Sequence, residues 1–400
     1  MPIPVIYALV ISIIILILLV KIKINISYSF LATAIIFGIL SYPLHIFIKK
    51  LYTALTDYFS IQLIIIFILI FFFAMYLYEV GALKELIEEV SNINASLAAI
   101  LIPAFIGLIP MPGGALISAI MVKDLYFNRL KLSGGYAAYL NYWFRHIWIA
   151  IWPIYQCIII SAYILHISVD KLITITWPIS VTAIISGLIL SYKLLLVKSK
   201  ANSKANILRI LKHTSPFIVI FILTVIVGLS LLSTIAIITV IVLLIYGIKK
   251  KPILKAIQFS LSPQILALVI AAIIFKHLFS SGDLSNEVLS VLKTTSVPDV
   301  FFTFLLPLLL SFISANEYIT FSISYPILNS IYDLSLHNNY IYLSYLGGYL
   351  GAYLSPLHIC LILTSQYYEI NMISVYKYIL TSIAIMATLS LIIYYVYFPL

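Results

Sequence analysis

Two apolar segments of this sequence contain polar side chains that are able to bind ions or to move protons. Arg145 and His146 follow Asn141 in the first segment, and His358 follows Ser355 in the second. A guanidinium inside an apolar segment needs a carboxylate, backbone carbonyls or an anionic ligand as its partner. The two histidines are candidates for hydrogen bonds to a substrate or for proton transfer. Asn141 and Ser355 also lie where each helix is expected to break, and the backbone groups freed by a break can coordinate ions or substrates.

These residues have structural interpretations as well, which the sequence leaves open. Arg145 could pair with Glu79 or extend toward a membrane interface. Either histidine could be an interior residue whose hydrogen bonds are satisfied within the protein.

A helix-breaking motif, PMPGG, interrupts the apolar segment 96–122 and contains Pro112, Gly113 and Gly114. The arms on either side are ~15–21 Å of helix, about half of a ~30 Å hydrocarbon core. This pattern predicts a re-entrant hairpin whose tip lies near the middle of the membrane, where irregular backbone must line a cavity or be buried in protein. The glycines would let backbone amides approach a ligand, or would serve only close packing of the hairpin.

A second interruption, SANE, lies inside the apolar block 300–328. Ser314 and Asn316 are good N-cap residues for a returning half-helix, whose positive end would favour an anion. Glu317 falls in the first turn of that half-helix. A carboxylate there can simply complement the helix dipole, but at mid-membrane depth it is costly and marks an ion or proton pathway. Glu317 is therefore a candidate proton carrier or cation ligand.

The elements that must position these residues are membrane spans. Of the 400 residues, 64% are hydrophobic and 9% are charged, which predicts an all-α polytopic membrane protein without a separate water-soluble domain. The net charge of +10 lies in short loops, so it indicates membrane topology rather than nucleic-acid binding. Cys157 and Cys360 lie in apolar segments and indicate neither a disulfide framework nor a metal cluster.

Hydropathy predicts a series of spans and one amphipathic arm at the membrane surface, Leu83–Val90. The spans are expected near 3–20, 29–48, 61–80, 133–165, 172–197, 216–248 (two short spans), 262–280, 341–366 and 376–398. The first span lacks a basic start and a clear cleavage site, so it is expected to be retained.

The two halves of the chain resemble each other. PAFIGLIPMPGG in the first half aligns with PLLLSFISANEY in the second, and each half continues with a GGY motif and then a histidine. These matches predict two repeats, 1–198 and 205–400, each with about five spans and one re-entrant hairpin. An odd number of crossings inverts the second repeat, so the two hairpins would enter from opposite sides and meet near the midplane.

The basic residues indicate the orientation of this arrangement. With both termini outside, the cytoplasmic loops hold sixteen lysines and arginines, and the outer loops hold four, Lys49, Lys50, Lys171 and Lys293. This asymmetry agrees with the positive-inside rule.

The PMPGGAL hairpin, its SANE counterpart and the later segment YLSPLHICLILT resemble an uncharacterised family of prokaryotic integral-membrane proteins. That family is grouped with the ion-transporter superfamily, beside gluconate permeases, citrate transporters and TRAP-type large subunits. The resemblance implies a homodimer in the cell membrane, a scaffold domain, and a transport domain that moves as an elevator, both interleaved across the two repeats. Sodium–dicarboxylate relatives carry Ser-Asn-Thr motifs at the tips, which this sequence lacks, so sodium coupling does not carry over.

These observations lead to a hypothesis of secondary active transport. The expected substrate is a small organic anion of the carboxylate type, coupled to a proton or sodium gradient, with protons favoured because Glu317 and two histidines are available. A cation/proton antiporter that uses Glu317 is the alternative. A membrane-embedded enzyme is disfavoured because the chain has no HExxH, GxSxG or aspartate-rich diphosphate motif. Apart from a bound coupling ion, Na+ or H+, no cofactor and no metal site are expected.

Overall fold

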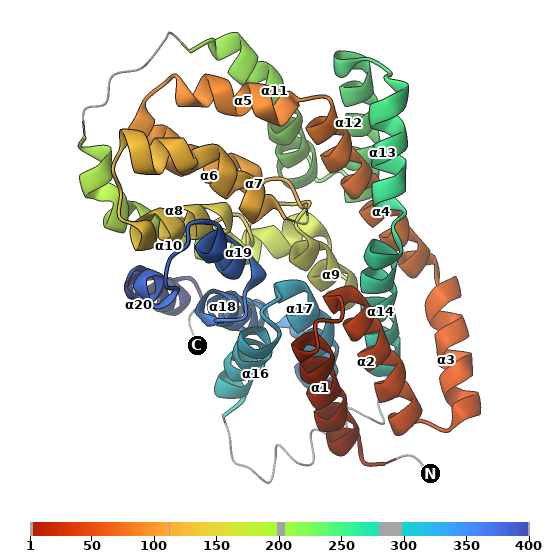
Figure 1. Cartoon of the computed structure of the whole chain (residues 1–400). Helices are drawn as coiled ribbons and strands as arrows, with labels where there is room; N and C mark the ends of the chain where they lie inside the picture. Colours follow the sequence, from red (N-terminus) through yellow and green to blue (C-terminus); the bar gives the residue numbers. More distant parts are fainter. Residues whose placement is uncertain (1–2, 112, 198–204, 280–297, 399–400) are drawn as a thin grey trace.

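The computed structural model describes residues 3–111, 113–197, 205–279 and 298–398, and all of their regular secondary structure is helical (Figure 1). The first half of the chain contains α1 (Val5–Lys21), α2 (Ile26–Ser41), α3 (Leu44–Thr56), α4 (Tyr58–Glu79), α5 (Ala82–Ser91), α6 (Ala95–Gly107), α7 (Gly114–Asp124), the π-helix η1 (Leu125–Arg129), α8 (Gly134–Arg145), α9 (Gln156–Leu165) and α10 (Val169–Leu195). The second half contains α11 (Ile207–Phe221), the π-helix η2 (Ile222–Ile226), α12 (Leu231–Tyr246), α13 (Lys250–Ser260), α14 (Pro263–Phe279), α16 (Asp299–Ser314), α17 (Glu317–Tyr332), the 3₁₀ turn η3 (Leu334–Leu336), α18 (Asn338–Leu354), α19 (Ile359–Tyr367) and α20 (Ile373–Tyr397). The predicted all-α fold class is therefore confirmed.

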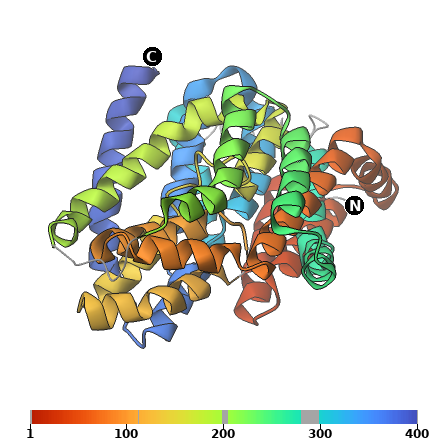
Figure 2. The same cartoon turned by 90° about the horizontal axis from the view of Figure 1, so that it is seen from above.

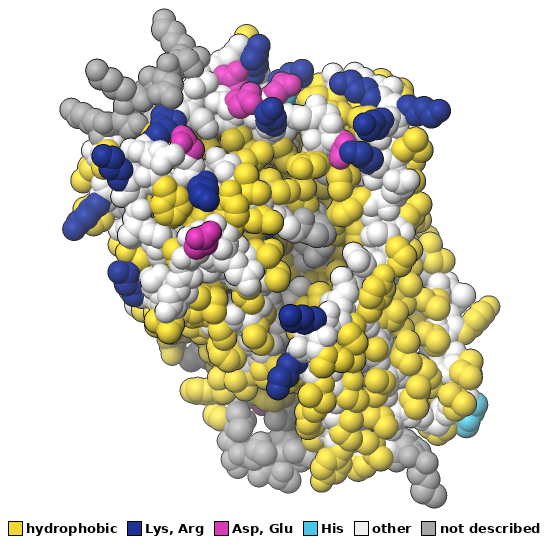
Figure 3. Space-filling model, in the orientation of Figure 1, with side chains coloured by type: hydrophobic (Ala, Val, Ile, Leu, Met, Phe, Trp, Pro, Cys, Tyr) yellow, Lys and Arg dark blue, Asp and Glu magenta, His cyan; other side chains and the backbone are white. Residues whose placement is uncertain are grey.

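Six helical stretches are long and apolar enough to cross a membrane. They are Tyr58–Glu79, Val169–Leu195, Ile207–Ile226, Lys250–Phe279, Asn338–Tyr367 and Ile373–Tyr397. Shorter apolar helices, among them α1, α2, α6, α9, α12 and α16, accompany them. Hydrophobic side chains cover much of the face in Figure 3, while many charged ones gather toward the end formed by α5, α11 and the α12–α13 corner. These features indicate a multi-pass membrane protein in contact with lipid.

The helix boundaries follow the predicted spans with two differences. The predicted span 29–48 is wrong as a single element, because the chain turns at Tyr42 and Pro43 between α2 and α3. Proline favours an extended conformation in the residue before it, and Tyr42 has φ −133° and ψ 149°. Helix α13 lies between two predicted spans. Its three lysines lower the mean hydropathy of the segment below that of a membrane span.

The helices form two packed groups, and each group draws on both halves of the chain (Figures 1 and 2). In the first group, α2 packs on α1 and α14, and α4 packs on α12 and α13. In the second group, the hairpins α6–α7 and α16–α17 pack on α8 and α18, and α10 packs on α20. With α5 and η2 counted in the first group, the main contacts between the groups are those of α14 with α17, α5 with α6, and η2 with α10. Few helices therefore connect the two groups.

Stacked aromatic rings hold the first group together between α2 and α14. Phe37 stacks on Phe275 and Phe279 with ring centroids 5.6 and 5.3 Å apart, and Phe30 stacks on Phe275 at 5.4 Å. Offset stacking adds to the burial of such large side chains. The α2–α14 pair is consequently closely packed, and α14 also contacts α17.

Two glycines let α18 approach α16 closely. Gly347 and Gly351 are four residues apart and lie on one face of α18. A Cβ at Gly347 would overlap the carbonyl oxygen of Phe304, and one at Gly351 would overlap that of Leu308. Small residues with this spacing are typical of close helix pairs in membranes. The contact fixes α16, and with it the second hairpin, relative to the helix that ends at the site described below.

We expect Gly351→Ala to lower the melting temperature of the purified protein in detergent. The added methyl group must push α16 away from α18, and overpacking of this kind costs about 1–3 kcal/mol. Gly134→Ala is the comparison, because its Cβ meets the Ile370 side chain and no backbone atom, so that one side chain has to move instead of a whole helix. Equal losses in both variants would mean that the glycine contact between α16 and α18 has no special weight.

Candidate functional site

The first hairpin turns between α6 and α7. Gly113 precedes α7 with φ 73°, a left-handed conformation that glycine adopts readily. A Cβ at Gly114 would overlap Nη2 of Arg145. Glycine at this position therefore lets the guanidinium approach the first turn of α7. Pro112, the proline of the predicted tip, lies outside the described residues.

The second hairpin turns between α16 and α17. Ala315 takes a left-handed φ of 53°, and Asn316 caps α17 by accepting a hydrogen bond from the Ile319 N–H at 3.1 Å. Ser314 is not a cap of α17, because its hydroxyl donates to the Asn316 carbonyl at 3.2 Å and stabilises the turn. Glu317 is the first residue of α17.

Each hairpin is followed by a helix that breaks. Helix α8 ends at Arg145, and α9 begins only at Gln156. Helix α18 ends at Leu354, and α19 begins at Ile359 after a short turn that contains Ser355. The Ser355 hydroxyl donates to the Phe312 carbonyl at 2.6 Å, which fastens this turn to α16.

Two tryptophans attach the segment between α8 and α9 to the first hairpin. The indole N–H of Trp148 donates to the Ala104 carbonyl at 2.7 Å, and that of Trp152 donates to the Leu108 carbonyl at 2.9 Å. Backbone groups near helix ends need such partners where water is absent.

Three tyrosines of α18 hold the same segment from the other side. Their hydroxyls donate to backbone carbonyls at distances of 2.8 Å for Tyr345 to Ile149, 2.9 Å for Tyr349 to His146 and 3.1 Å for Tyr353 to Trp143. None of these three tyrosines was singled out from the sequence. The spacing of four residues, which places all three on one helix face, is the pattern that could have revealed their role.

One cavity of about 330 Å³ lies where the hairpins and the broken helices meet. Of the predicted site residues, it is lined by Gly113, Gly114, Arg145, His146, Asn316, Glu317 and His358. The cavity is also lined by residues that were not singled out from the sequence, among them Asn25, Tyr155, Gln156, Ser262, Gln264 and Cys360. The structure thus brings residues of both hairpins, both broken helices, the α1–α2 turn and α14 to one space.

Five helix N-termini face this cavity, and four of them belong to the hairpins and the broken helices. The first residues of these four helices, α7, α9, α17 and α19, are Gly114, Gln156, Glu317 and Ile359, and the fifth is Ile26 of α2. The first turn of a helix has unpaired N–H groups and a partial positive charge. These helix ends favour an anion in the cavity.

Arg145 adds a full positive charge to the same wall. The residue is only 7% exposed, and its Nη1 donates to the Cys360 sulfur at 3.3 Å. Its buried Nε has no hydrogen-bond partner among the described residues. The predicted alternative of a pair with Glu79 is wrong, because Glu79 pairs with Lys255 at 2.8 Å.

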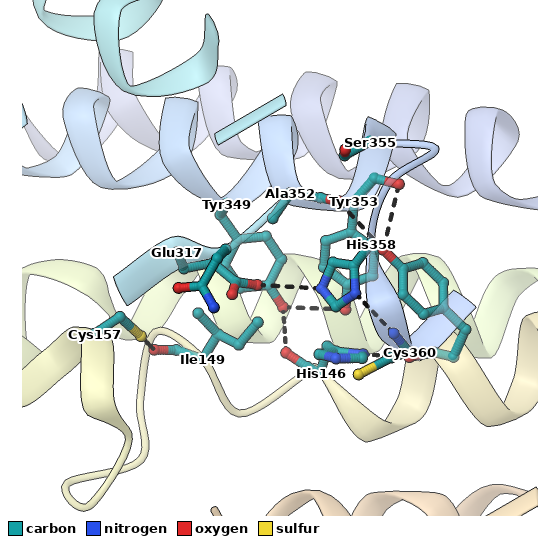
Figure 4. A network of polar contacts seen from close by, with 12 residues as sticks. His146, Ile149, Cys157, Glu317, Tyr349, Ala352, Tyr353, Ser355, His358 and Cys360 are labelled. Carbon is teal, nitrogen blue, oxygen red and sulfur yellow. Dashed lines mark hydrogen bonds and ion pairs between the residues drawn. The ribbon is translucent and has the colours of Figure 1, made fainter. Parts of the chain in front are cut away.

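Glu317, His146 and His358 lie close together at this cavity (Figure 4). Glu317 Oε1 lies 3.8 Å from His358 Nε2, too far for a hydrogen bond, and this buried oxygen has no other partner in the described chain. The rings of His146 and His358 lie edge to face, with centroids 4.9 Å apart. His358 Nδ1 accepts a hydrogen bond from the Cys360 N–H at 3.3 Å, so the ring proton is assigned to Nε2, which faces Glu317.

Asn141, Ser314 and Ser355 are not among the residues that line the cavity. Asn141 is fully buried, where it accepts from Ser118 Oγ at 2.5 Å and donates to the Ala115 carbonyl at 3.1 Å and to Thr364 Oγ1 at 2.9 Å. It therefore ties α8 to α7 and α19 just behind the cavity wall.

We expect Asn141→Leu to destabilise the protein. The apolar side chain would leave the Ser118 hydroxyl without a partner, at a cost of about 1–3 kcal/mol for an unsatisfied buried group. It would also remove one bond each from the Ala115 carbonyl and from Thr364, whose hydroxyl still donates to the Cys360 carbonyl. Thermal unfolding in detergent measures the loss. The control is Asn128→Leu, which removes only the exposed bond of Asn128 to Asp124. A melting temperature of the Asn141 variant at or above that of the control would contradict this role.

Lys276 of α14 does not line the cavity. It is only 8% exposed, and its Nζ lies 3.8 Å from the ring centroid of Tyr163. A cation–π contact therefore stabilises this buried amine.

Comparison with known proteins identifies a similar fold and a family. The fold is similar to that of the YdaH transporter of Alcanivorax borkumensis, with a TM-score of 0.59, 12% sequence identity and coverage of 89% of both chains. At this identity the likeness is one of fold. A search of curated proteins gives no match. The family model described as "Protein of unknown function (DUF401)" matches residues 4–397, nearly the whole chain, so the chain belongs to this family.

Proposed function

We propose that this protein is a secondary active transporter of a small organic anion of the carboxylate type. The observation that carries the proposal is the cavity of about 330 Å³ at which five helix N-termini and Arg145 meet. A carboxylate can accept bidentate hydrogen bonds from a guanidinium and further bonds from the free N–H groups of helix ends. The similar fold of a protein described as a transporter supports the proposal.

The two hairpins favour a transport cycle over simple binding. We infer that repeats 1–198 and 205–400 have inverted topology, which would bring the two hairpin turns together from opposite sides of the membrane. In support of this arrangement, α7 packs on α19 and α17 packs on α9, so each hairpin contacts the broken helix of the other half. The second helix group would be the transport domain and the first group the scaffold of a homodimer. Their limited contact is what an elevator motion requires.

Glu317 is the proposed coupling residue, with protons favoured over sodium. Its Oε1 is buried and faces His358 Nε2 at 3.8 Å, and the residue lines the same cavity as Arg145. A carboxylate that is neutral when protonated and charged when released gives the site two electrostatic states. Binding of an anion beside Arg145 and of a proton at Glu317 would then favour each other.

Uptake into liposomes tests the function. The purified protein is reconstituted and offered a panel of radiolabelled mono-, di- and tricarboxylates under an imposed proton gradient, an imposed sodium gradient or neither. We expect accumulation of at least one acid that requires the proton gradient and stops when a protonophore collapses it. Absence of uptake for the whole panel, by protein that unfolds cooperatively, would remove the assignment.

A cation/proton antiporter is the second candidate, because Glu317 is a carboxylate without a hydrogen-bonded partner for its buried oxygen. A pH-sensitive dye inside the same liposomes separates the two functions. An antiporter would dissipate a proton gradient when Na+ or K+ is added without any organic acid, whereas the proposed anion symporter would not.

A further inference from the structure

Three side chains with metal-binding atoms converge at the cavity wall, although the sequence predicts no metal site. One ligand atom from each of His146, His358 and Cys360 lies within 4.8 Å of the other two. His146 follows α8, whereas His358 and Cys360 stand at the start of α19, so the cluster joins the two broken helices. Both histidines are buried, Cys360 is half-buried, and all three line the cavity (Figure 4).

His146 is oriented as metal-binding histidines are. Its Nδ1 donates to the Tyr142 carbonyl at 2.7 Å, which fixes the ring and leaves the lone pair on Nε2. A hydrogen bond from the second ring nitrogen to a backbone carbonyl is the usual outer-shell partner of a histidine ligand. The Tyr349 hydroxyl further holds the backbone of His146 by donating to its carbonyl at 2.9 Å.

Cys360 faces positive charge. Nη1 of Arg145 lies 3.3 Å from the sulfur, and Cys360 stands in the first turn of α19, at the positive end of that helix. Thiolate is the form of cysteine that binds metals. By contrast, the sulfur of Cys157, the other cysteine, lies near the Tyr345 hydroxyl at 3.2 Å and the Ile149 carbonyl at 3.5 Å, and Cys157 does not line the cavity.

A fourth ligand is available at the same wall. Glu317 Oε1 is buried, has no hydrogen-bond partner among the described residues, and lies 3.8 Å from His358 Nε2. Coordination through His358 Nε2 moves the ring proton to Nδ1 and ends only the long contact of 3.3 Å from the Cys360 N–H.

We propose that His146, His358, Cys360 and Glu317 bind a divalent transition-metal ion of the Zn²⁺ class. Two imidazoles, one thiolate and one carboxylate form a tetrahedral ligand set that suits Zn²⁺ and does not suit Mg²⁺ or Ca²⁺. Metal–ligand bonds of ~2.0–2.3 Å separate tetrahedral ligand atoms by ~3.3–3.8 Å, so the side chains must close by about 1 Å. The proposal does not rest on transport of an organic anion. Zn²⁺ and a proton would compete for Glu317, so the metal-bound protein would not use this residue for proton coupling.

The charges of this site are balanced. A divalent cation with one thiolate and one carboxylate ligand is neutral as a unit, so burial of the metal adds no net charge to the wall. The charge of Arg145 is then left for an anion in the rest of the cavity. The metal and a carboxylate can consequently occupy the cavity together.

Direct binding to the full-length protein in detergent tests the proposal. After treatment with a chelator, the protein is titrated with Zn²⁺ in competition with a chromophoric chelator, and with Co²⁺ while its absorption spectrum is recorded. We expect one Zn²⁺ per chain and a near-ultraviolet charge-transfer band that shows a thiolate bonded to Co²⁺. Cys360→Ser should abolish the band, and His146→Ala should weaken Zn²⁺ binding by about 100-fold or more, since loss of an outer-shell partner alone costs about 10–100-fold.

Cys157→Ser is the matched control, and it should keep both the affinity and the band. Binding that is lost in the Cys360 variant and retained in the Cys157 variant supports the site. Absence of stoichiometric Zn²⁺ binding by the wild type, or a Co²⁺ spectrum without a thiolate band, overturns the proposal without any variant. Because no step measures transport, failure of carboxylate uptake leaves this result unaffected.

Discussion

Arg145→Ala should reduce carboxylate uptake by roughly 30-fold or more, since removal of one partner from a buried, hydrogen-bonded charge pair costs about 2–5 kcal/mol. The guanidinium stands against the first turn of α7, and its Nε lacks a partner in the described chain. An anion in the cavity would supply that partner. Initial rates of uptake of the preferred carboxylate, measured at several concentrations, check the prediction.

The melting temperature distinguishes a role of Arg145 in substrate binding from a structural role. Because Arg145 is buried with only a sulfur contact from its Nη1, its removal should leave the melting temperature unchanged or raised. Arg145→Lys keeps the charge but loses the planar fork, so it should recover only part of the activity. Arg129→Ala, which changes an exposed arginine of η1, is the control. Uptake by the Arg145→Ala variant at the level of this control would remove Arg145 from the site.

Glu317→Gln should abolish accumulation driven by the proton gradient while exchange of substrate across the membrane continues. Glutamine keeps the size and a hydrogen-bonding end of the side chain but cannot take up or release a proton. The cavity would then bind substrate without a link to the gradient. Accumulation and counterflow, measured on the same liposomes, distinguish the two activities.

The control for this substitution is Glu88→Gln, which changes an exposed carboxylate on α5 next to Lys84. It should leave both accumulation and exchange unchanged. If accumulation by the Glu317 variant still depends on the proton gradient, another group carries the proton. If both activities disappear while folding is intact, Glu317 is needed for substrate binding instead.

The helical fold and the hairpins are visible in the sequence because breakers interrupt apolar runs. Pro-Met-Pro-Gly-Gly and Ser-Ala-Asn-Glu stand where α7 and α17 begin, and both turns contain a residue with left-handed φ. Backbone preferences of this kind are local, so they can be read from a few residues. The helices α3 and α13 were harder to predict because they are amphipathic and contain lysines, so a search for continuous apolar runs does not detect them as separate elements.

The composition of the site was only partly predictable, since it depends on contacts between distant positions. Cys360 looked like a small hydrophobic residue, and nothing in its neighbourhood pointed to Arg145, which lies 215 residues earlier. Asn141 was singled out as a polar residue in an apolar segment. Such a residue can line a cavity or lie behind the cavity wall, and the sequence alone does not distinguish these two positions. The tyrosines of α18 lie on one helix face, which the sequence shows. Their partners are backbone carbonyls, and because every residue has one, the sequence does not show which of them accept these bonds.

These tyrosines of α18 have a consequence for biosynthesis. The carbonyls of Trp143, His146 and Ile149 receive their hydroxyl partners from residues that are translated 196 to 210 positions later. The carbonyls of Trp143 and His146 also accept N–H groups of their own segment, so before α18 is inserted each keeps one partner, while the Ile149 carbonyl has only the Cys157 thiol at 3.5 Å. The segment between α8 and α9 is therefore fully tied down only when the last third of the chain has been synthesised.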